Sequence, residues 1–161
     1  MCVLDMNFDD YEQRLQNAKQ LRTVDKRIIH RLLAKTEVLL RRFNGIEKSS
    51  IGFGDLNMFI LNDWYQLNDK VRFKKIHKSE NVLVFETEMD EGGEFGWHYH
   101  SDCREICQVI KGAIHDAKTE FDYEQNQTVI YEPGEEHIPV ALLDTKLIVI
   151  FERKTNVKTK V

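Results

Sequence analysis

Two histidines, His98 and His100, stand one residue apart and are followed by Glu105 in the stretch GGEFGWHYHSDCREICQVIKG. Side chains two residues apart in a β-strand point to the same side, so an extended segment here directs both imidazoles at one spot. A hairpin at the link SDCR returns the Glu105 carboxylate to the same end of that face. The spacing therefore predicts three converging metal ligands.

A fourth candidate ligand lies further along the chain. His137 follows the turn residues Pro133 and Gly134 and precedes an apolar run, so we expect it at the start of a strand. Three imidazoles and one carboxylate suit a divalent transition metal (Fe, Mn, Ni, Cu, Co or Zn) better than Ca²⁺ or Mg²⁺, which prefer oxygen ligands. The metal type is left open among these six.

The first group of residues resembles a motif of the cupin superfamily, G-x5-H-x-H-x(3,4)-E-x6-G. Every defined position of that motif is matched, at Gly92, His98, His100, Glu105 and Gly112. A lone histidine is more often structural than a ligand, but this fixed spacing favours metal binding.

The second cupin motif, G-x5-P-x-G-x2-H-x3-N, is matched in part. Gly134 and His137 fit, whereas Pro133 stands one place late. Asn126 replaces the leading glycine and Ala141 replaces the final asparagine. These departures affect turns and supporting positions and leave the histidine in place. The resemblance covers about residues 53–152.

The resemblance implies a mainly β fold, a double-stranded β-helix (the cupin jelly-roll barrel) over residues 49–161, with an N-terminal α-helical extension over residues 1–48. It also implies that the barrel mouth holds one metal ion on four side chains: His98, His100, Glu105 and His137. Cupins with such ligands include dioxygenases, sugar and sugar-phosphate isomerases, and decarboxylases, and the fold does not choose among them.

We expect a metal-dependent enzyme that acts on a small molecule, and we favour dioxygenase chemistry over isomerisation. The alternative is a non-catalytic module that senses a small ligand or a metal and acts through its N-terminal helices. A third interpretation is that the barrel only supports a dimer. No acid or base residue is identified, because Glu135 and Glu136 are expected to be exposed turn residues.

The N-terminal part has the spacing of amphipathic helices. A helix is predicted from Thr23, as N-cap, to Asn44-Gly45, and a shorter one over residues 7–22 with Phe8, Tyr11, Leu15, Ala18 and Leu21 on its apolar side. Together they predict a helical hairpin or bent pair. In the longer helix, the apolar stripe is Ile28, Ile29, Leu32, Leu33, Thr36, Leu39, Leu40 and Phe43.

Partners of this helix follow from its two faces. We expect the apolar stripe to pack on the strand domain or on a second subunit, and a homodimer is predicted. The basic side chains are expected to form a solvated face, because two helices do not supply the three-helix scaffold that usually supports a helix-turn-helix. Residues 44–55 are interpreted as the joint between the two parts.

Short β-prone segments with hairpin-sized connections follow from residue 53 onward. Strands are predicted at residues 56–61, 71–76, 82–89, 96–100, 104–111, 113–118, 128–132, 137–142 and 146–152. The last is apolar on both faces, so we expect it to be central in its sheet and covered on both sides. On the inward face, Phe85, Thr87, Met89, Pro139 and Ala141 are candidate pocket-lining residues.

Composition bounds the remaining possibilities. The 161 residues carry a net charge of −4, so no overall basic field attracts nucleic acid. No apolar run is long enough to span a membrane, and we expect a cytoplasmic protein. Cys2, Cys103 and Cys107 are predicted to be reduced thiols, with Cys107 either in the core or lining the pocket. Structural roles are expected for three further histidines: His30, His77 and His115.

Overall fold

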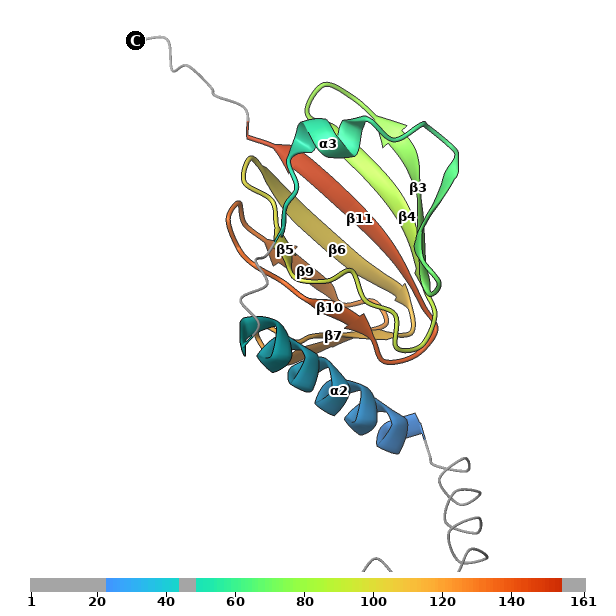
Figure 1. The fold of residues 1–161 in the computed structure, drawn as a ribbon. Coiled ribbons are helices and arrows are strands. Elements are labelled where there is room, and N and C mark those ends of the chain that lie inside the picture. Colours follow the sequence, from blue (N-terminus) through green and yellow to red (C-terminus); the bar gives the residue numbers. More distant parts are fainter. Residues whose placement is uncertain (1–22, 44–48, 155–161) are drawn as a thin grey trace, which may run out of the picture.

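The computed structural model describes residues 23–43 and 49–154, which form one long helix, one short helix and a β-barrel of packed sheets (Figure 1). The helix predicted over residues 7–22 lies outside this range. Nothing in the described chain is a helix long and apolar enough to cross a membrane.

The larger layer is a six-stranded antiparallel sheet in the order β2-β3-β4-β11-β6-β9. Its strands are β2 (Trp64–Asn68), β3 (Val71–Lys78), β4 (Val82–Met89), β6 (Cys103–Lys111), β9 (Thr128–Tyr131) and β11 (Thr145–Arg153). β11 pairs with β4 on one side and β6 on the other, which confirms its predicted central place. Its inward side chains Leu147, Val149 and Phe151 are buried. Ile148 and Ile150 on the outer face are only half-buried, so the prediction that the strand is covered on both sides is wrong for the outer face.

Two smaller sheets complete the barrel. One is antiparallel and consists of β7 (Ala113–Asp116), β8 (Phe121–Glu124) and β10 (Pro139–Ala141), with β7 in the middle. The other is a short parallel pair of β1 (Ser49–Ser50) and β5 (His98–Tyr99). The turn from β6 to β7 requires glycine: Gly112 has φ +88°, and a Cβ there would lie 2.4 Å from the carbonyl oxygen of Asp144.

One predicted strand, residues 56–61, is wrong. Residues Phe53–Asn57 instead form the helix α3, which buries Phe53 and Leu56 and lies at one end of the large sheet (Figure 1). The Gly52 N–H donates to Asp55 Oδ2 at 2.9 Å, a capping-box bond that satisfies a free donor at the helix start. The predicted joint is thus in part an ordered segment.

The eight other predicted strands are present; the strand predicted over residues 82–89 has the bounds of β4, and the other seven have shifted ends. The sequence reasoning missed β1, β2 and β8. Every residue of β2 is exposed, so this edge strand lacks the alternation of buried and exposed positions that reveals a strand.

The long helix α2 spans Thr23–Phe43, as predicted, and lies along the small sheet of β7 and β10 (Figure 1). The expectation of a solvated basic face is wrong for Arg27 and Arg31, which are half-buried and form ion pairs with acidic residues of the barrel. Lys35 also pairs with an acidic residue of the barrel but stays exposed, as expected. The pairs are Arg27 with Glu124, Arg31 with Asp122, and Lys35 with Glu120. His30 also contacts Glu91, at 2.9 Å.

The apolar stripe of α2 does not pack on the strand domain. Most of its side chains are exposed, whereas Ala34 and Val38, on the side that faces the barrel, are buried. The helix therefore binds its own barrel through charged and small residues. Of the two predicted locations of the stripe, packing on the strand domain is therefore excluded for the described side chains, and packing on a second subunit stays a prediction.

Candidate metal centre

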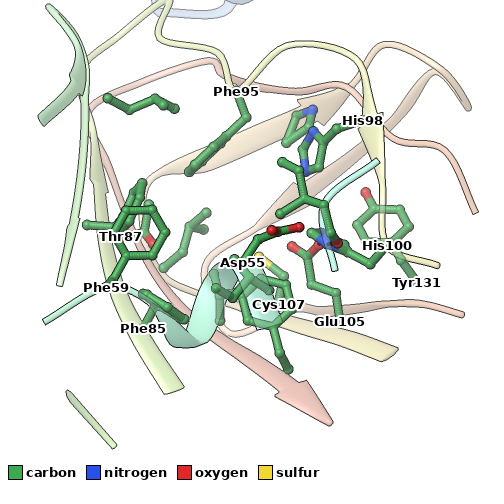
Figure 2. Close-up of a pocket in the computed structure, with 18 of the residues that line it drawn as sticks. Asp55, Phe59, Phe85, Thr87, Phe95, His98, His100, Glu105, Cys107 and Tyr131 are labelled. Atoms are coloured by element: carbon green, nitrogen blue, oxygen red, sulfur yellow. Dashed lines mark hydrogen bonds and ion pairs between the residues drawn. The ribbon is translucent and has the colours of Figure 1, made fainter. Parts of the chain in front are cut away.

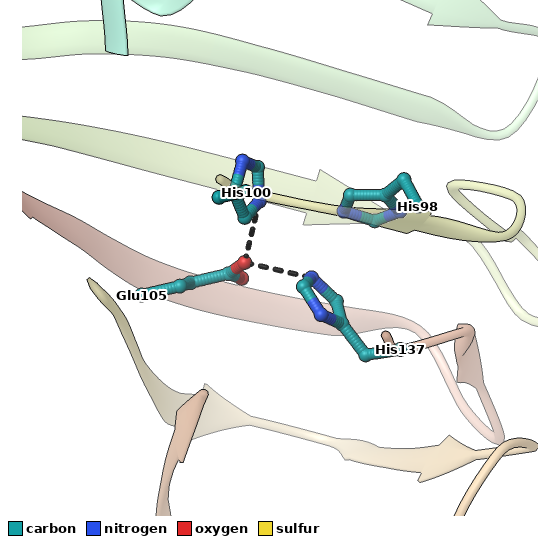
Figure 3. A group of neighbouring side chains, drawn as sticks. All are labelled: His98, His100, Glu105 and His137. Carbon is teal, nitrogen blue, oxygen red and sulfur yellow. Dashed lines mark hydrogen bonds and ion pairs between the residues drawn. The ribbon is translucent and has the colours of Figure 1, made fainter. Parts of the chain in front are cut away.

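The four predicted ligands converge in the structure. His98, His100, Glu105 and His137 are all buried, and one ligand atom from each lies within 4.8 Å of those of the others (Figure 3). His98 belongs to β5, His100 follows it, and Glu105 lies on β6. His137 precedes β10, so the group joins segments that are far apart in the sequence.

Backbone pairing sets the positions of the histidines. The His98 N–H donates to the carbonyl of His137 at 3.2 Å, and the His137 N–H donates back to the carbonyl of His98 at 3.0 Å. Gly134, in the left-handed conformation at φ +87°, donates its N–H to the carbonyl of His100 at 2.8 Å. The Pro-Gly turn thus ties the fourth ligand to the first two.

Each imidazole is oriented by a backbone carbonyl. The Nδ1 atoms of His98, His100 and His137 lie 3.0, 2.7 and 3.1 Å from the carbonyl oxygens of Gly96, Ile51 and Glu135. A carbonyl oxygen only accepts, so Nδ1 carries the proton in each ring, and in a neutral ring Nε2 keeps its lone pair. This fixes three rings in the tautomer that binds metal through Nε2.

One oxygen of Glu105 lies between two of these nitrogens. Glu105 Oε2 is 2.9 Å from His100 Nε2 and 2.8 Å from His137 Nε2 (Figure 3). His137 Nε2 is fully buried, and its geometry to the carboxylate does not meet that of a hydrogen bond. Lone pairs and a carboxylate repel one another, so this arrangement is stable only when a proton or a cation is shared among them.

The pKa values of the metal-free group reflect this sharing. Burial alone would raise the pKa of Glu105, but the positive charge of His137 and the hydrogen bond from His100 hold it well below its usual value. Burial alone would lower the pKa of His137, but the Glu105 charge outweighs this effect, so the pKa is raised from its usual value. For His98, burial together with the His137 charge lowers the pKa to about 4.

The residues present therefore fit a metal ion. An ion attracts the Nε2 lone pairs and the carboxylate at once and satisfies the buried His137 Nε2. Two ligands of one ion lie at most about 4.2 Å apart, twice a metal–nitrogen bond of about 2.1 Å. The four ligand atoms lie within 4.8 Å of one another, so small rotations of the side chains are enough to bring them within about 4.2 Å. The group could hold a transition metal, and its ligand types leave the choice of metal open.

A buried tyrosine supports the fourth ligand. The ring of Tyr131 stacks on His137 with centroids 4.1 Å apart and planes 10° from parallel. Its hydroxyl donates to Asp116 Oδ2 at 3.0 Å, while Asp116 Oδ1 accepts the N–H of Ile138 at 3.1 Å. Asp116 is itself completely buried. Tyr131 thus positions His137 from behind.

A cavity of about 220 Å³ opens beside the metal ligands, and His98, His100 and Glu105 are part of its wall (Figure 2). The wall is mainly apolar, and five phenylalanine rings contribute to it: Phe59, Phe73, Phe85, Phe95 and Phe151. Asp55 and Leu67 line it and are also exposed, so they mark its opening. Among the described residues that line the cavity, none is a lysine or an arginine.

Several predicted site residues take the expected places. Phe85, Thr87 and Pro139 line the cavity, whereas Met89 and Ala141 are buried away from it. The remaining candidates have other roles. Cys107 is buried and also lines the cavity, Cys103 is buried elsewhere, and both are free thiols. Burial raises the pKa of Cys103 to about 12 and raises that of Cys107, so both stay protonated.

The other histidines and the turn glutamates stay outside the metal group. His115 donates its Nδ1 proton to Asp122 at 2.7 Å, and His77 is exposed. Glu136 accepts a hydrogen bond from the Trp97 indole at 2.7 Å, which links the loops that carry His98 and His137.

Sequence reasoning missed the carbonyl of Ile51, the carboxylate of Asp55 and the stack of Tyr131. Val129 and Tyr131 are two residues apart on the predicted strand 128–132 and therefore point to the same side of it, so an inward Val129 could have indicated an inward Tyr131. Ile51 and Asp55 carried no signal, because they stood in a segment interpreted as a linker.

Metal binding is expected to weaken at acidic pH, and the pKa of His137 sets the pH range in which this happens. Because the pKa of His137 is raised, its proton competes with the ion at a higher pH than that of an ordinary histidine, while His98, with a pKa of about 4, is already neutral there. Below the His137 pKa, the affinity should fall roughly tenfold per pH unit. Chelator-competition titrations between about pH 6 and about pH 8 measure this. In Glu105→Gln, which removes the charge that raises this pKa, binding should be weaker and the decline should begin at lower pH. An affinity independent of pH contradicts the expectation.

Removal of the Tyr131 ring should loosen the fourth ligand. In Tyr131→Ala the metal affinity is expected to fall about 10- to 100-fold, the usual effect of losing a group that orients a ligand. Tyr131→Phe keeps the stacked ring and loses only the hydroxyl, so its affinity should stay near that of the unchanged protein while its stability falls by about 1–3 kcal/mol. Equal metal affinity in all three proteins would show that the stack has no part in metal binding.

Comparison with known proteins supports the fold. No protein-family model matches the chain, and no curated protein matches its sequence significantly. The structure is similar to that of KdgF from Halomonas sp., with a TM-score of 0.54, 18% identity, and coverage of 58% of this chain and 90% of that chain. It is also similar to an RmlC-like cupin from Shewanella frigidimarina, with a TM-score of 0.53, 13% identity, and coverage of 59% and 86%.

The cupin domain of Schizosaccharomyces pombe Cnp3 gives a TM-score of 0.50 at 16% identity, covering 52% of this chain and 61% of that chain. Identities this low show the fold and not the activity. The six-stranded and three-stranded antiparallel sheets agree with these likenesses and confirm the predicted mainly β fold. The helix α2 confirms the predicted N-terminal helical extension within the described residues. The chain has the fold of RmlC-like cupins, a double-stranded β-helix, with a buried group of side chains that could hold a metal ion.

Proposed function

We propose that this protein is a metal-dependent enzyme that acts on a small, mostly apolar molecule with one metal-chelating polar group. The observation that carries the proposal is that an apolar cavity and the metal ligands share one wall (Figure 2). His98, His100, Glu105 and His137 would hold the ion. When bound, a divalent transition metal supplies a Lewis acid for an enol or carbonyl oxygen and, if redox-active, a means to activate O₂.

The cavity wall supports this substrate class. Its volume of about 220 Å³ exceeds the roughly 150 Å³ of an apolar cavity that binds benzene, so a single ring or a short branched chain fits. Without lysine or arginine in the described wall, a phosphate or a second carboxylate would enter without a counter-charge. The polar head of the substrate is therefore the part that faces Glu105 and the histidines.

The same wall favours dioxygenase over isomerase chemistry. A sugar or sugar phosphate presents several hydroxyl groups, each of which loses hydrogen bonds to water in an apolar cavity. Away from the metal group, few lining residues are polar: Asp55, Thr87, Cys107 and Tyr131. Of these, the Tyr131 hydroxyl is already bonded to Asp116 and Asp55 lies at the opening. Dioxygen is apolar and enters such a cavity without that loss.

Substrate and oxygen assays test the proposal. Protein loaded in turn with Fe²⁺, Mn²⁺, Ni²⁺, Cu²⁺, Co²⁺ or Zn²⁺ should consume O₂ with an enolisable aryl or branched-alkyl dicarbonyl compound for at least one redox-active metal, and should not isomerise sugar phosphates. The cavity variant Phe59→Ala should raise KM by about tenfold or more, because it removes part of the apolar wall. Met58→Ala is the matched control, since the neighbouring Met58 is exposed and outside the wall.

Three results would contradict the proposal. Turnover of sugar phosphates without O₂ uptake would replace dioxygenase by isomerase chemistry. If the protein bound the apolar compounds tightly but turned them over with none of the six metals, the alternative of a non-catalytic sensing module would be favoured. Equal KM values for Phe59→Ala and Met58→Ala would show that the substrate does not use the cavity.

A further inference from the structure

The helix α2 presents a continuous apolar surface on the side away from the barrel. Six large side chains there are between 43% and 62% exposed: Ile28, Ile29, Leu32, Leu33, Leu39 and Leu40. We call these six residues the α2 apolar face. Contiguous apolar surfaces of this kind on otherwise polar proteins mark interaction sites.

The opposite side of α2 is fixed to the barrel. Arg27, Arg31 and Lys35 pair with acidic residues of the β8 region, and Ala34 and Val38 are buried against the barrel. The helix cannot roll to bury its leucines without breaking these ion pairs. The α2 apolar face is therefore held outward.

The spacing of this face indicates what covers it. Ile29, Leu32, Thr36 and Leu39 follow one another at steps of three, four and three residues, the repeat of a helix that packs along another helix. The same repeat occurs upstream in the sequence at Phe8, Tyr11, Leu15 and Ala18, residues outside the described structure, so this segment of the same chain is the rival occupant, and a single-chain mass in solution would favour it. In the described part of the chain, the only other helix is α3, whose five residues lie at the far end of the large sheet.

We propose that the α2 apolar face pairs with the same face of a second copy of this chain, so that two helices join two barrels in a homodimer. Six side chains that are each about half exposed amount to roughly 500 Å² per chain. Their pairing buries roughly 1,000 Å² in total, the lower limit for a specific interface, and a two-fold axis uses one face twice.

Charge is consistent with this occupant. Two strongly basic helices repel each other when their charges are free, but Arg27, Arg31 and Lys35 are neutralised by Glu124, Asp122 and Glu120 of their own barrel. Asp122 also accepts from His115, which anchors this contact inside the small sheet. The barrel acids thus reduce the repulsion between two copies of α2. This inference depends on neither the metal nor the enzymatic proposal.

The outer face of the large sheet is the rival surface. Ile130 on β9 is 50% exposed, and Ile110 on β6 is also exposed. Charged side chains such as Arg104 and Glu132, which pair with each other, interrupt this surface, and it has no helical repeat. It provides a matched control for the α2 apolar face.

Sedimentation of the full chain from about 1 µM to about 100 µM tests the proposal. The unchanged protein should have twice the 19.0 kDa mass of one chain. Leu32→Glu combined with Leu39→Glu should raise the dimer dissociation constant at least about a hundredfold, because each change occurs once in each copy and places a charge in the seam. Both positions are exposed in one chain, so folding should persist, as circular dichroism and metal binding can verify.

Ile130→Glu is the control and should leave the dimer intact. The proposal is overturned by a single-chain mass for the unchanged protein over the whole range. It is also overturned when the Leu32→Glu, Leu39→Glu double variant stays dimeric, or when Ile130→Glu dissociates the dimer as strongly, because the pairing surface would then lie elsewhere.

Discussion

Three hydrogen bonds from imidazole Nδ1–H groups to backbone carbonyls determine the chemistry of this barrel. The carbonyls belong to Ile51, Gly96 and Glu135, on three separate segments, and each commits one ring to a single tautomer. Neutral rings held in this way direct Nε2 lone pairs toward the centre of the group, where Glu105 adds a carboxylate. Such a group is electrostatically unfavourable unless a cation joins it. The fold thus maintains a site whose need for a positive charge is part of its geometry.

The rest of the barrel supplies what a metal centre needs beyond its ligands. Tyr131 and the buried Asp116 hold His137 from behind, and the Trp97–Glu136 hydrogen bond ties the two ligand loops together. The mainly apolar wall makes the neighbouring cavity a medium of low polarity, which strengthens electrostatic interactions between the ligands and a bound group. These features make the centre rigid on one side and accessible on the other.

The sequence predicted the ligands and most strands because these signals are local. The His98–His100 spacing and the alternation in residues 82–89 depend only on strand periodicity. It did not predict α3, since a five-residue helix that starts with glycine has little periodic signal. It also identified both faces of α2 but not which one faces the barrel. That choice depends on Asp122 and Glu124, about 90 residues further along the chain, whose positions only the tertiary fold determines.

The account depends on the four side chains acting together on one ion, and metal stoichiometry tests this most directly. Protein purified without a metal-affinity tag, equilibrated with each candidate ion and desalted, should retain one transition metal ion per chain by elemental analysis. His137→Ala should retain less than about a tenth of that amount, whereas His77→Ala, which changes an exposed histidine outside the group, should match the unchanged protein. Full retention in His137→Ala, or no retention of any ion by the unchanged protein, would contradict the account.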